Sequence, residues 1–204
     1  MITLVSYPRC GSHYLRSLME DYSGMRDRSW TSRGSGAFWC NHIHDRSTRG
    51  PHGYSGKVVH LYRNPVDVVY SLAEYHRADD DGFTPFDKKC YQFADEYLVH
   101  CRKYFTKNIA EEKFTIRYED LTSDDMTVRI QTFFGMLDFI DLGVEKDEEK
   151  MTQVFLSNTY DRVREKVDDK NVVRGNYGND KTKFRDDFGR EIYFRFKEFE
   201  EFRS

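Results

Sequence analysis

The sequence predicts an α/β protein with a central parallel β-sheet and helices on both of its faces. Two observations predict this fold class. Short apolar runs at residues 2–7, 57–62 and 113–118 have the pattern of strands, and each precedes a segment with apolar residues at helical spacing. Strands that alternate with helices form parallel sheets, because each helix returns the chain across one face of the sheet. The 204 residues, 38% of them hydrophobic, suffice for one core, and we expect a single domain over residues 1–204.

The elements of the first half follow in order. Residues 2–7 are short, apolar and β-branched, which is typical of a buried parallel strand. Residues 12–22 carry apolar side chains on one helical face, and Gly24 suits the C-terminal cap of that helix. Residues 26–56 are rich in Gly, Arg, Ser and His. We therefore expect a long functional loop there, with one short strand at residues 37–40.

The second half continues the alternation. Pro65 follows the strand at residues 57–62 and suits the first turn of a helix, where its missing N–H costs nothing. We expect this helix to end at about Arg77. Further helices are expected at residues 86–106, at 124–139 and from about 147, with a strand at 113–118. A closing helix is expected to carry Phe188, Ile192, Phe196, Phe199 and Phe202. In such a sheet, ligands bind at the carboxyl ends of the strands.

Charge and cysteine content narrow the functional classes. The formal net charge of −3 argues against a general nucleic-acid-binding protein. The four cysteines, Cys10, Cys40, Cys90 and Cys101, lack the spacing of metal ligands, so we expect reduced thiols and a cytoplasmic protein. Met1 leads directly into the first strand, and no apolar run approaches transmembrane length. We therefore expect neither a signal peptide nor a membrane span.

Two strand-to-helix turns, at residues 7–15 and 63–71, point to phosphate binding. Such a turn directs free backbone N–H groups and the positive end of a helix dipole at one point, which suits an anion. In the first turn Arg9 lies at the strand end, Gly11 permits close backbone approach, and Ser12 can cap the helix. The turn lacks the Gly-Lys-Ser/Thr sequence that binds Mg²⁺ and nucleoside triphosphates. Two such turns on parallel neighbours suit a ligand with phosphates on both sides of a ribose.

Four segments, in order along the chain, resemble motifs of the sulfotransferase family that uses 3′-phosphoadenosine 5′-phosphosulfate. Residues 7–14 resemble its 5′-phosphosulfate loop, residues 63–71 its 3′-phosphate motif, residues 117–121 its Tyr-Glu-Asp segment, and residues 174–178 its late glycine loop. The resemblance implies a P-loop NTPase-like three-layer sandwich, and transfer of a sulfuryl group from that donor to a hydroxyl or amine. It also implies that no metal takes part.

The resemblance assigns the donor site residue by residue. The residues expected to bind the donor are Arg9, Cys10, Gly11, Ser12, His13, Tyr14, Arg63, Ser71, Tyr118, Tyr160, Arg174 and Gly175. Arg9 occupies the position of the family's lysine, so it is expected to stabilise the charge that develops on the leaving oxygen. Arginine keeps that charge but gives up a proton poorly, which leaves the proton-donating role of the lysine open.

A base for the acceptor is expected in the segment His42-Ile43-His44, which corresponds to the family's Lys-x-His pattern. On spacing, His44 takes the position of the histidine base and His42 that of the lysine, and His42 remains the alternative base. Histidine titrates near neutrality, so it can take up the proton of a hydroxyl. In an extended strand both rings point to the same side. The same spacing suits a metal, but no nearby Cys, Glu or third His completes a ligand set.

Two other functions stay open at this point. A P-loop nucleotide or small-molecule kinase shares the sheet and the phosphate turn, although the magnesium-binding residues are missing. A catalytically inactive protein that binds the donor or its product is the other alternative, because Arg9 and His42 replace lysines of the family. Segments 26–56 and 79–87 are expected to line the acceptor site. Their Arg, His and Tyr content favours a small polar acceptor, such as a saccharide, over a flat apolar phenol.

Overall fold

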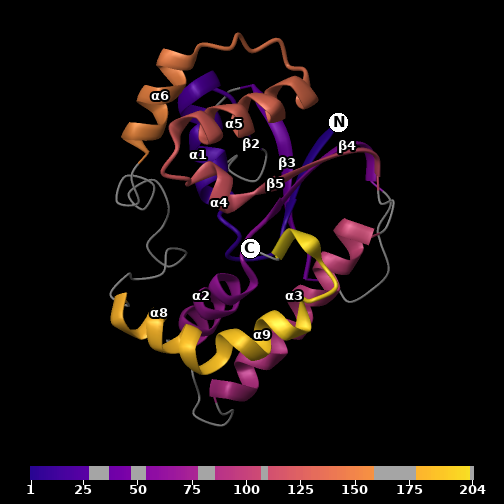
Figure 1. Cartoon of the computed structure of the whole chain (residues 1–204). Coiled ribbons are helices and arrows are strands. Elements are labelled where there is room, and N and C mark those ends of the chain that lie inside the picture. The colour runs from indigo at the N-terminus through magenta and orange to yellow at the C-terminus, as the bar shows by residue number, and fades with distance from the viewer. Residues whose placement is uncertain (28–36, 47–53, 78–85, 107–109, 159–177, 203–204) are drawn as a thin grey trace.

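The computed structural model describes residues 1–27, 37–46, 54–77, 86–106, 110–158 and 178–202. Its centre is a five-stranded sheet in the order β2-β3-β1-β4-β5, in which every pair of neighbours is parallel (Figure 1). The strands are β1 Ile2–Ser6, β2 Arg26–Asp27, β3 Phe38–His44, β4 Tyr54–Tyr62 and β5 Ala110–Arg117. The predicted α/β fold class is confirmed.

Helices lie around the sheet in two groups (Figure 1). Helices α1 (Ser12–Ser23), α5 (Met126–Ile140) and α6 (Glu148–Ser157) pack together in one group. Helices α2 (Pro65–Arg77), α3 (Phe86–Thr106) and α9 (Arg190–Arg195) form the other. The shorter elements are α4 Tyr118–Leu121, α8 Gly178–Phe184, a π-helical turn Arg185–Gly189 and a 3₁₀ turn Glu200–Phe202. Within the described ranges, no helix combines the length and the apolar character that crossing a membrane requires.

Strand β1 positions the site because it lies between β3 and β4. Ser6, its last residue, is paired with His44 of β3 on one side and with Leu61 of β4 on the other. Since all three strands run in parallel, their carboxyl ends meet at one edge of the sheet. That edge therefore carries the turn after β1, the turn after β4, and the histidines at the end of β3.

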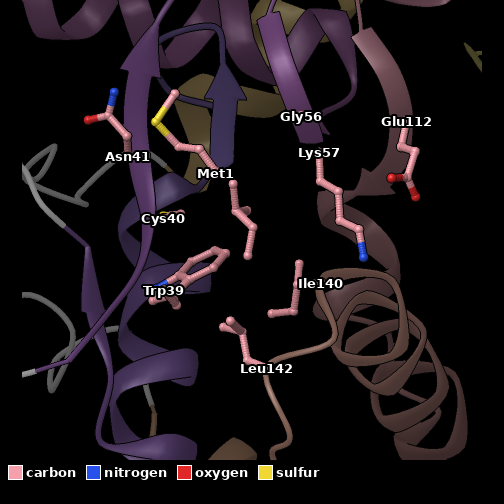
Figure 2. A pocket seen from close by; sticks show the side chains of 10 residues that line it. Met1, Trp39, Cys40, Asn41, Gly56, Lys57, Glu112, Ile140 and Leu142 are labelled. Carbon is pink, nitrogen blue, oxygen red and sulfur yellow. The ribbon is translucent and has the colours of Figure 1, made fainter.

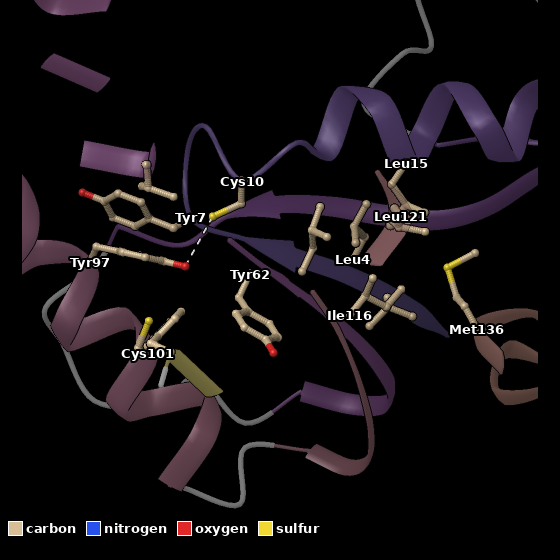
Figure 3. Close-up of a cluster of buried hydrophobic side chains, with 14 of the residues drawn as sticks. Leu4, Tyr7, Cys10, Leu15, Tyr62, Tyr97, Cys101, Ile116, Leu121 and Met136 are labelled. Carbon is tan, nitrogen blue, oxygen red and sulfur yellow. Dashed lines mark hydrogen bonds between the residues drawn. The ribbon is translucent and has the colours of Figure 1, made fainter. Parts of the chain in front are cut away.

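Buried side chains of the hydrophobic core pack beneath this edge of the sheet and hold it in place. Figure 3 shows Leu4 and Ile116 of the sheet among buried side chains from the helices, with Tyr97 of α3 beside the first turn. Leu4, Ile116 and Tyr97 are each at most 1% exposed. Burial of an aliphatic side chain of this size stabilises the fold by about 1.5–3 kcal/mol. The same core therefore holds the sheet together and supports the turns after β1 and β4.

Most element boundaries agree with the predictions. Gly24 caps α1 with a left-handed φ of 75°, and its N–H donates to the Glu20 carbonyl, as the helix stop required. Asp125 and Asp147 cap α5 and α6 by accepting hydrogen bonds from backbone N–H groups in the first turn. These caps explain why both helices begin within two residues of the predicted positions.

Several predicted boundaries are wrong, and β4 and β5 each begin three residues earlier than expected, at Tyr54 and Ala110. The short strand at residues 37–40 continues to His44, because its backbone pairs with β1 from Thr3 to Ser6. Strand β5 ends at Arg117, and Tyr118 begins α4 instead of ending the strand. The closing helix ends at Arg195, so Phe196, Phe199 and Phe202 reach the core from turns and not from one helical face.

Candidate functional site

The turn after β1 has an unusual backbone. Arg9 and Gly11 both have left-handed φ values, 72° and 91°. For a residue with a side chain this conformation costs about 1–2 kcal/mol, so Arg9 is held there by its surroundings. Gly11 occupies the N-cap position of α1 without a side-chain cap, and Ser12 is the first helical residue. The prediction that Ser12 caps the helix is therefore wrong, and the amides at this helix start remain suited to an anion.

Tyr118 packs directly on Gly11 and joins the two turns. A Cβ atom added at Gly11 would lie 2.2 Å from Cδ2 of Tyr118. The guanidinium of Arg63 lies 4.6 Å from the centre of the same ring, and the Tyr14 ring meets it edge-on at 6.0 Å between centroids. Tyr14 and Tyr118 were expected near the base of the donor. They lie together beside the first turn.

The turn after β4 is fixed through the backbone of Arg63. The buried Tyr97 hydroxyl donates to the Arg63 carbonyl at 2.8 Å and accepts from the Arg63 N–H at 3.1 Å. The same hydroxyl lies 3.8 Å from Cys10 Sγ, an interaction drawn in Figure 3. The next N–H, that of Asn64, donates to Glu119 Oε1 at 2.9 Å. One core tyrosine therefore sets both turns relative to each other.

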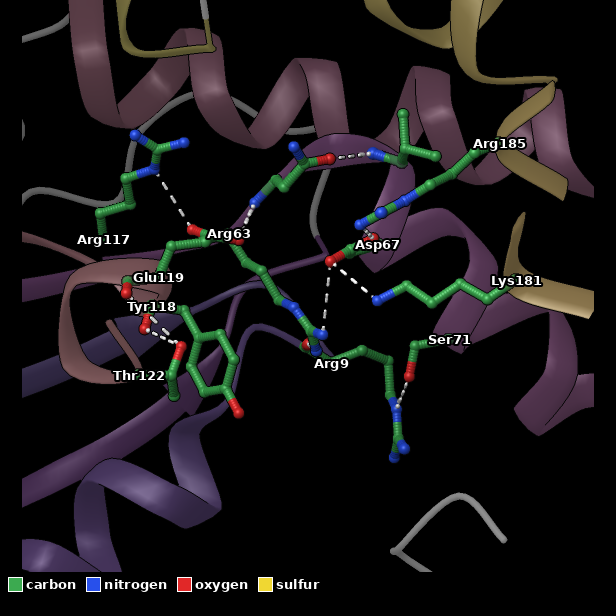
Figure 4. Close-up of polar contacts among 12 residues, drawn as sticks. Arg9, Arg63, Asp67, Ser71, Arg117, Tyr118, Glu119, Thr122, Lys181 and Arg185 are labelled. Atoms are coloured by element: carbon green, nitrogen blue, oxygen red, sulfur yellow. Dashed lines mark hydrogen bonds and ion pairs between the residues drawn. The ribbon is translucent and has the colours of Figure 1, made fainter. Parts of the chain in front are cut away.

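The side chains of the two turns touch. Arg9 Nε donates to Ser71 Oγ at 3.1 Å, and Arg63 Nη1 donates to the Arg9 carbonyl at 3.2 Å. Figure 4 shows Arg9 and Arg63, which follow β1 and β4, together with Ser71 of α2. Within the described part of the chain, the buried Nε of Arg63 has no hydrogen-bond partner. The two predicted anion sites are therefore adjacent and share a set of donors.

Asp67 forms ion pairs with three cationic side chains beside the turn after β4 (Figure 4). Its carboxylate lies 3.7 Å from Arg63 Nη2, 3.1 Å from Lys181 Nζ and 2.9 Å from Arg185 Nη2. Burial raises the pKa of Asp67, but the three cations outweigh burial and hold that pKa below its usual value. Arg63 lies four residues before Asp67 in the chain, just before α2 begins. Lys181 and Arg185 were missed, since they lie 114 and 118 residues further along the chain.

The two histidines of β3 lie on the same side of the strand, as their alternation predicts. Ser6 Oγ lies 3.3 Å from His42 Nε2 and 3.2 Å from His44 Nδ1, and the two rings are 4.4 Å apart. Ser6 is fully buried, His42 is half-buried, and His44 keeps an exposed face. The sequence analysis did not identify Ser6, because nothing marks it before the pairing of β1 with β3 is known.

All three histidines near the first turn are neutral at pH 7. Partial burial and then the charge of Arg16 lower the pKa of His44 to about 4, although the Ser6 carbonyl raises it. Burial and Arg16 lower the pKa of His42 to about 2 and that of His13 to about 3. His13 Nδ1 accepts from Arg16 Nη2 at 2.7 Å. His13, which the resemblance placed in the donor site, is thus half-buried and hydrogen-bonded to Arg16.

Some predicted site residues lie outside the described residues, namely Tyr160, Arg174 and Gly175. Among the side chains that can be examined, no group of three or more His, Cys, Asp or Glu residues is arranged to hold a metal ion. A cavity of about 490 Å³ opens at the opposite edge of the sheet, between Met1, Trp39 and Lys57 of the strand beginnings and Leu142 (Figure 2). The cavity therefore lies at the other end of the strands from the turns after β1 and β4.

Comparison with known proteins identifies the family. The sulfotransferase domain profile matches residues 54–201. This chain belongs to the sulfotransferase family. The crystal structure of mouse sulfotransferase SULT7A1 complexed with PAP superposes with a TM-score of 0.66 at 16% sequence identity, covering 94% of this chain and 82% of that one. No curated protein sequence matches the chain. At this identity, the structural match supports the fold alone.

The family match includes only part of the candidate site of this sulfotransferase. The matched residues include the turn after β4, Asp67, Ser71 and Tyr118. The first turn with Arg9, and the histidines of β3, precede the matched segment. They enter the site because Arg9 contacts Ser71 and because Ser6 joins β1 to His44.

Proposed function

We propose that this sulfotransferase moves a sulfuryl group from 3′-phosphoadenosine 5′-phosphosulfate to a hydroxyl or amine of a small polar acceptor. The observation that carries the proposal is the contact between the two anion-binding turns, where Arg9 donates to Ser71 at 3.1 Å. A nucleotide that binds to both turns needs a phosphate on each side of its ribose. The presence of PAP in the SULT7A1 complex supports the same class of nucleotide.

The proposed donor site uses both turns. The amides at the start of α1 and the Arg9 guanidinium bind the 5′-phosphosulfate, and Arg63 with Ser71 binds the 3′-phosphate. Cys10, whose thiol is buried against Tyr97, contributes its backbone and not its side chain. Tyr14 and Tyr118 border the adenosine. The remaining donor contacts are proposed for Tyr160, Arg174 and Gly175 from the sequence resemblance.

We assign the base to His44. Its Nδ1 faces Ser6 and the Ser6 carbonyl raises its pKa, an arrangement that favours a proton on Nδ1 and leaves Nε2 to accept one. The Ser6 hydroxyl then donates to His42 Nε2, so that one serine orders both rings. His44 is the more exposed ring and has the higher pKa of the two, about 4 against about 2. Both properties favour it over His42.

The proposed transfer is in line and balances without a metal. The acceptor oxygen attacks sulfur while its proton passes to His44 Nε2. The bond between sulfur and the bridging phosphate oxygen breaks, and that oxygen keeps the electron pair. Arg9 and the amides of the first turn stabilise the charge on the leaving phosphate, where fixed donors act most strongly in the transition state.

The acceptor proposal rests on composition. Segments 26–56 and 79–87 lie mostly outside the described residues, and their Arg, His and Tyr content favours a polar acceptor such as a saccharide. The test is transfer of label from ³⁵S-labelled donor to a panel of saccharides, alcohols, amines and phenols. We expect transfer to a saccharide or another polar compound. Transfer to apolar phenols alone would contradict the polar acceptor.

Two matched variants, His44→Ala and His42→Ala, test which histidine is the base. We expect His44→Ala to abolish transfer while adenosine 3′,5′-bisphosphate still binds, and His42→Ala to retain most of the activity. Loss of activity in His42→Ala alone would move the base to that residue. Tight bisphosphate binding by the wild-type protein with no transfer to any acceptor would indicate an inactive binding protein. Magnesium-dependent ATP binding would indicate a kinase, and we expect none.

A further inference from the structure

The cations around Asp67 outnumber the carboxylate that they share. Arg63, Lys181 and Arg185 all point to this single group, which is 8% exposed. Three positive charges and one negative charge leave these four side chains with a net charge of +2. One carboxylate cannot neutralise three cations, so the net positive charge of the cluster favours binding of a further anion.

The charge excess matches a phosphate monoester. Such a group carries about −1.5 to −2 at neutral pH and offers three acceptor oxygens. Arg63 belongs both to this cluster and to the proposed 3′-phosphate site, since its Nη1 reaches the Arg9 carbonyl while its Nη2 faces Asp67. Lys181 and Arg185 remain 35% and 53% exposed, so both can reorient toward a ligand at low cost. The excess positive charge therefore lies where the ribose 3′-phosphate is expected to bind.

Building on the proposed function, we propose that Lys181 and Arg185 are further ligands of the ribose 3′-phosphate, and that Asp67 holds both cations beside Arg63 before the nucleotide binds. Helix α8 and the π-helical turn after it thereby become part of the nucleotide site. These two cations then determine selectivity for an adenosine nucleotide that carries a second phosphate over one that does not.

A purely structural role for the same contacts has different consequences. Exposed ion pairs contribute little to the stability of a fold, and ion pairs of this kind would hold α8 against α2 whether or not a nucleotide is bound. Loss of such ion pairs lowers stability and affects every nucleotide to a similar extent. Loss of a 3′-phosphate ligand affects only nucleotides that carry this phosphate.

The test compares two ligands on matched variants of the full chain. Isothermal titration calorimetry measures the affinity for adenosine 3′,5′-bisphosphate and for adenosine 5′-phosphate, which lacks the 3′-phosphate. The variants are Lys181→Met, Arg185→Met and the double variant, and thermal unfolding checks that each is folded. The control is Lys183→Met, which removes the same charge from an exposed position of the same helix that does not face Asp67.

We expect the double variant to bind the bisphosphate at least tenfold more weakly, while its affinity for adenosine 5′-phosphate changes less than twofold. We expect Lys183→Met to leave both affinities within twofold of the wild-type values. Unchanged bisphosphate affinity in the double variant, or an equal loss for both nucleotides, would overturn the inference and leave the proposed function intact. Failure of the wild-type protein to bind the bisphosphate would overturn both.

Discussion

Replacing Gly11 by alanine tests the packing of the first turn. The substitution places a Cβ atom 2.2 Å from Tyr118, where ordinary contacts begin at 3.4 Å, so the ring must move by about 1.2 Å. The left-handed φ of 91° adds about 1–2 kcal/mol of backbone strain. A displaced ring also loses its contact with the Arg63 guanidinium, worth about 0.5–1 kcal/mol. We expect bisphosphate affinity to fall at least about tenfold, or about 1.4 kcal/mol.

Gly24→Ala is the matched control for this substitution. Gly24 has a similar φ of 75°, but a Cβ atom there meets nothing within 4 Å. Both variants should lose about 1–2 kcal/mol of unfolding free energy in urea denaturation from the shared backbone strain, and Gly11→Ala should lose more because it also displaces the Tyr118 ring. Only Gly11→Ala should also lose affinity in calorimetry. Wild-type affinity in Gly11→Ala, or an equal loss in Gly24→Ala, would refute the reasoning that Tyr118 and Gly11 shape the nucleotide site.

Three further predictions concern residues behind the turns. Tyr97→Phe should lower the unfolding free energy by about 1–3 kcal/mol and weaken bisphosphate binding, because the Arg63 N–H and carbonyl lose a buried partner; denaturation and calorimetry measure both. Burial lowers the folded-state pKa of His60 and of His100, the latter to about 4, so only the unfolded state takes up protons as the pH falls below about 6.5. His100 should cost about 1.4 kcal/mol of stability per pH unit from there down to its folded-state pKa of about 4, and His60 should lower stability in the same direction. Neither should have an effect above pH 7, and urea denaturation at several pH values checks both. Bound bisphosphate should raise the pKa of His44 above its value of about 4, because a nearby anion offsets Arg16; an NMR titration of the ring protons that shows no change would contradict this.

The sequence predicted the parallel sheet and the two turns because their signals are local. A β-branched run, a proline at a helix start and a glycine at a helix stop each act within a few residues, and Pro65 and Gly24 occupy the positions predicted for them. The extent of β3 was underestimated. Its second half contains Asn41, His42 and His44, whose own strand propensity is weak, so the pairing with β1 extends the strand to His44.

The missed parts of the site depend on contacts between distant segments. Tyr97 orders Arg63 across 34 residues, and Asp67 meets Lys181 across 114. Neither pairing has a local signature, since an aromatic residue on a helical face predicts only burial and a lysine near a helix predicts only exposure. The residues proposed to bind phosphate were predictable from motifs, whereas the residues that support them became visible only in the folded chain.

The most direct test of the account is a crystal structure with adenosine 3′,5′-bisphosphate bound. We expect the 5′-phosphate against the amides at the start of α1, near Arg9, and the other phosphate in contact with Arg63 and Ser71. Arg63 and Ser71 directed away from the ribose, or Arg9 remote from the 5′-phosphate, would contradict it.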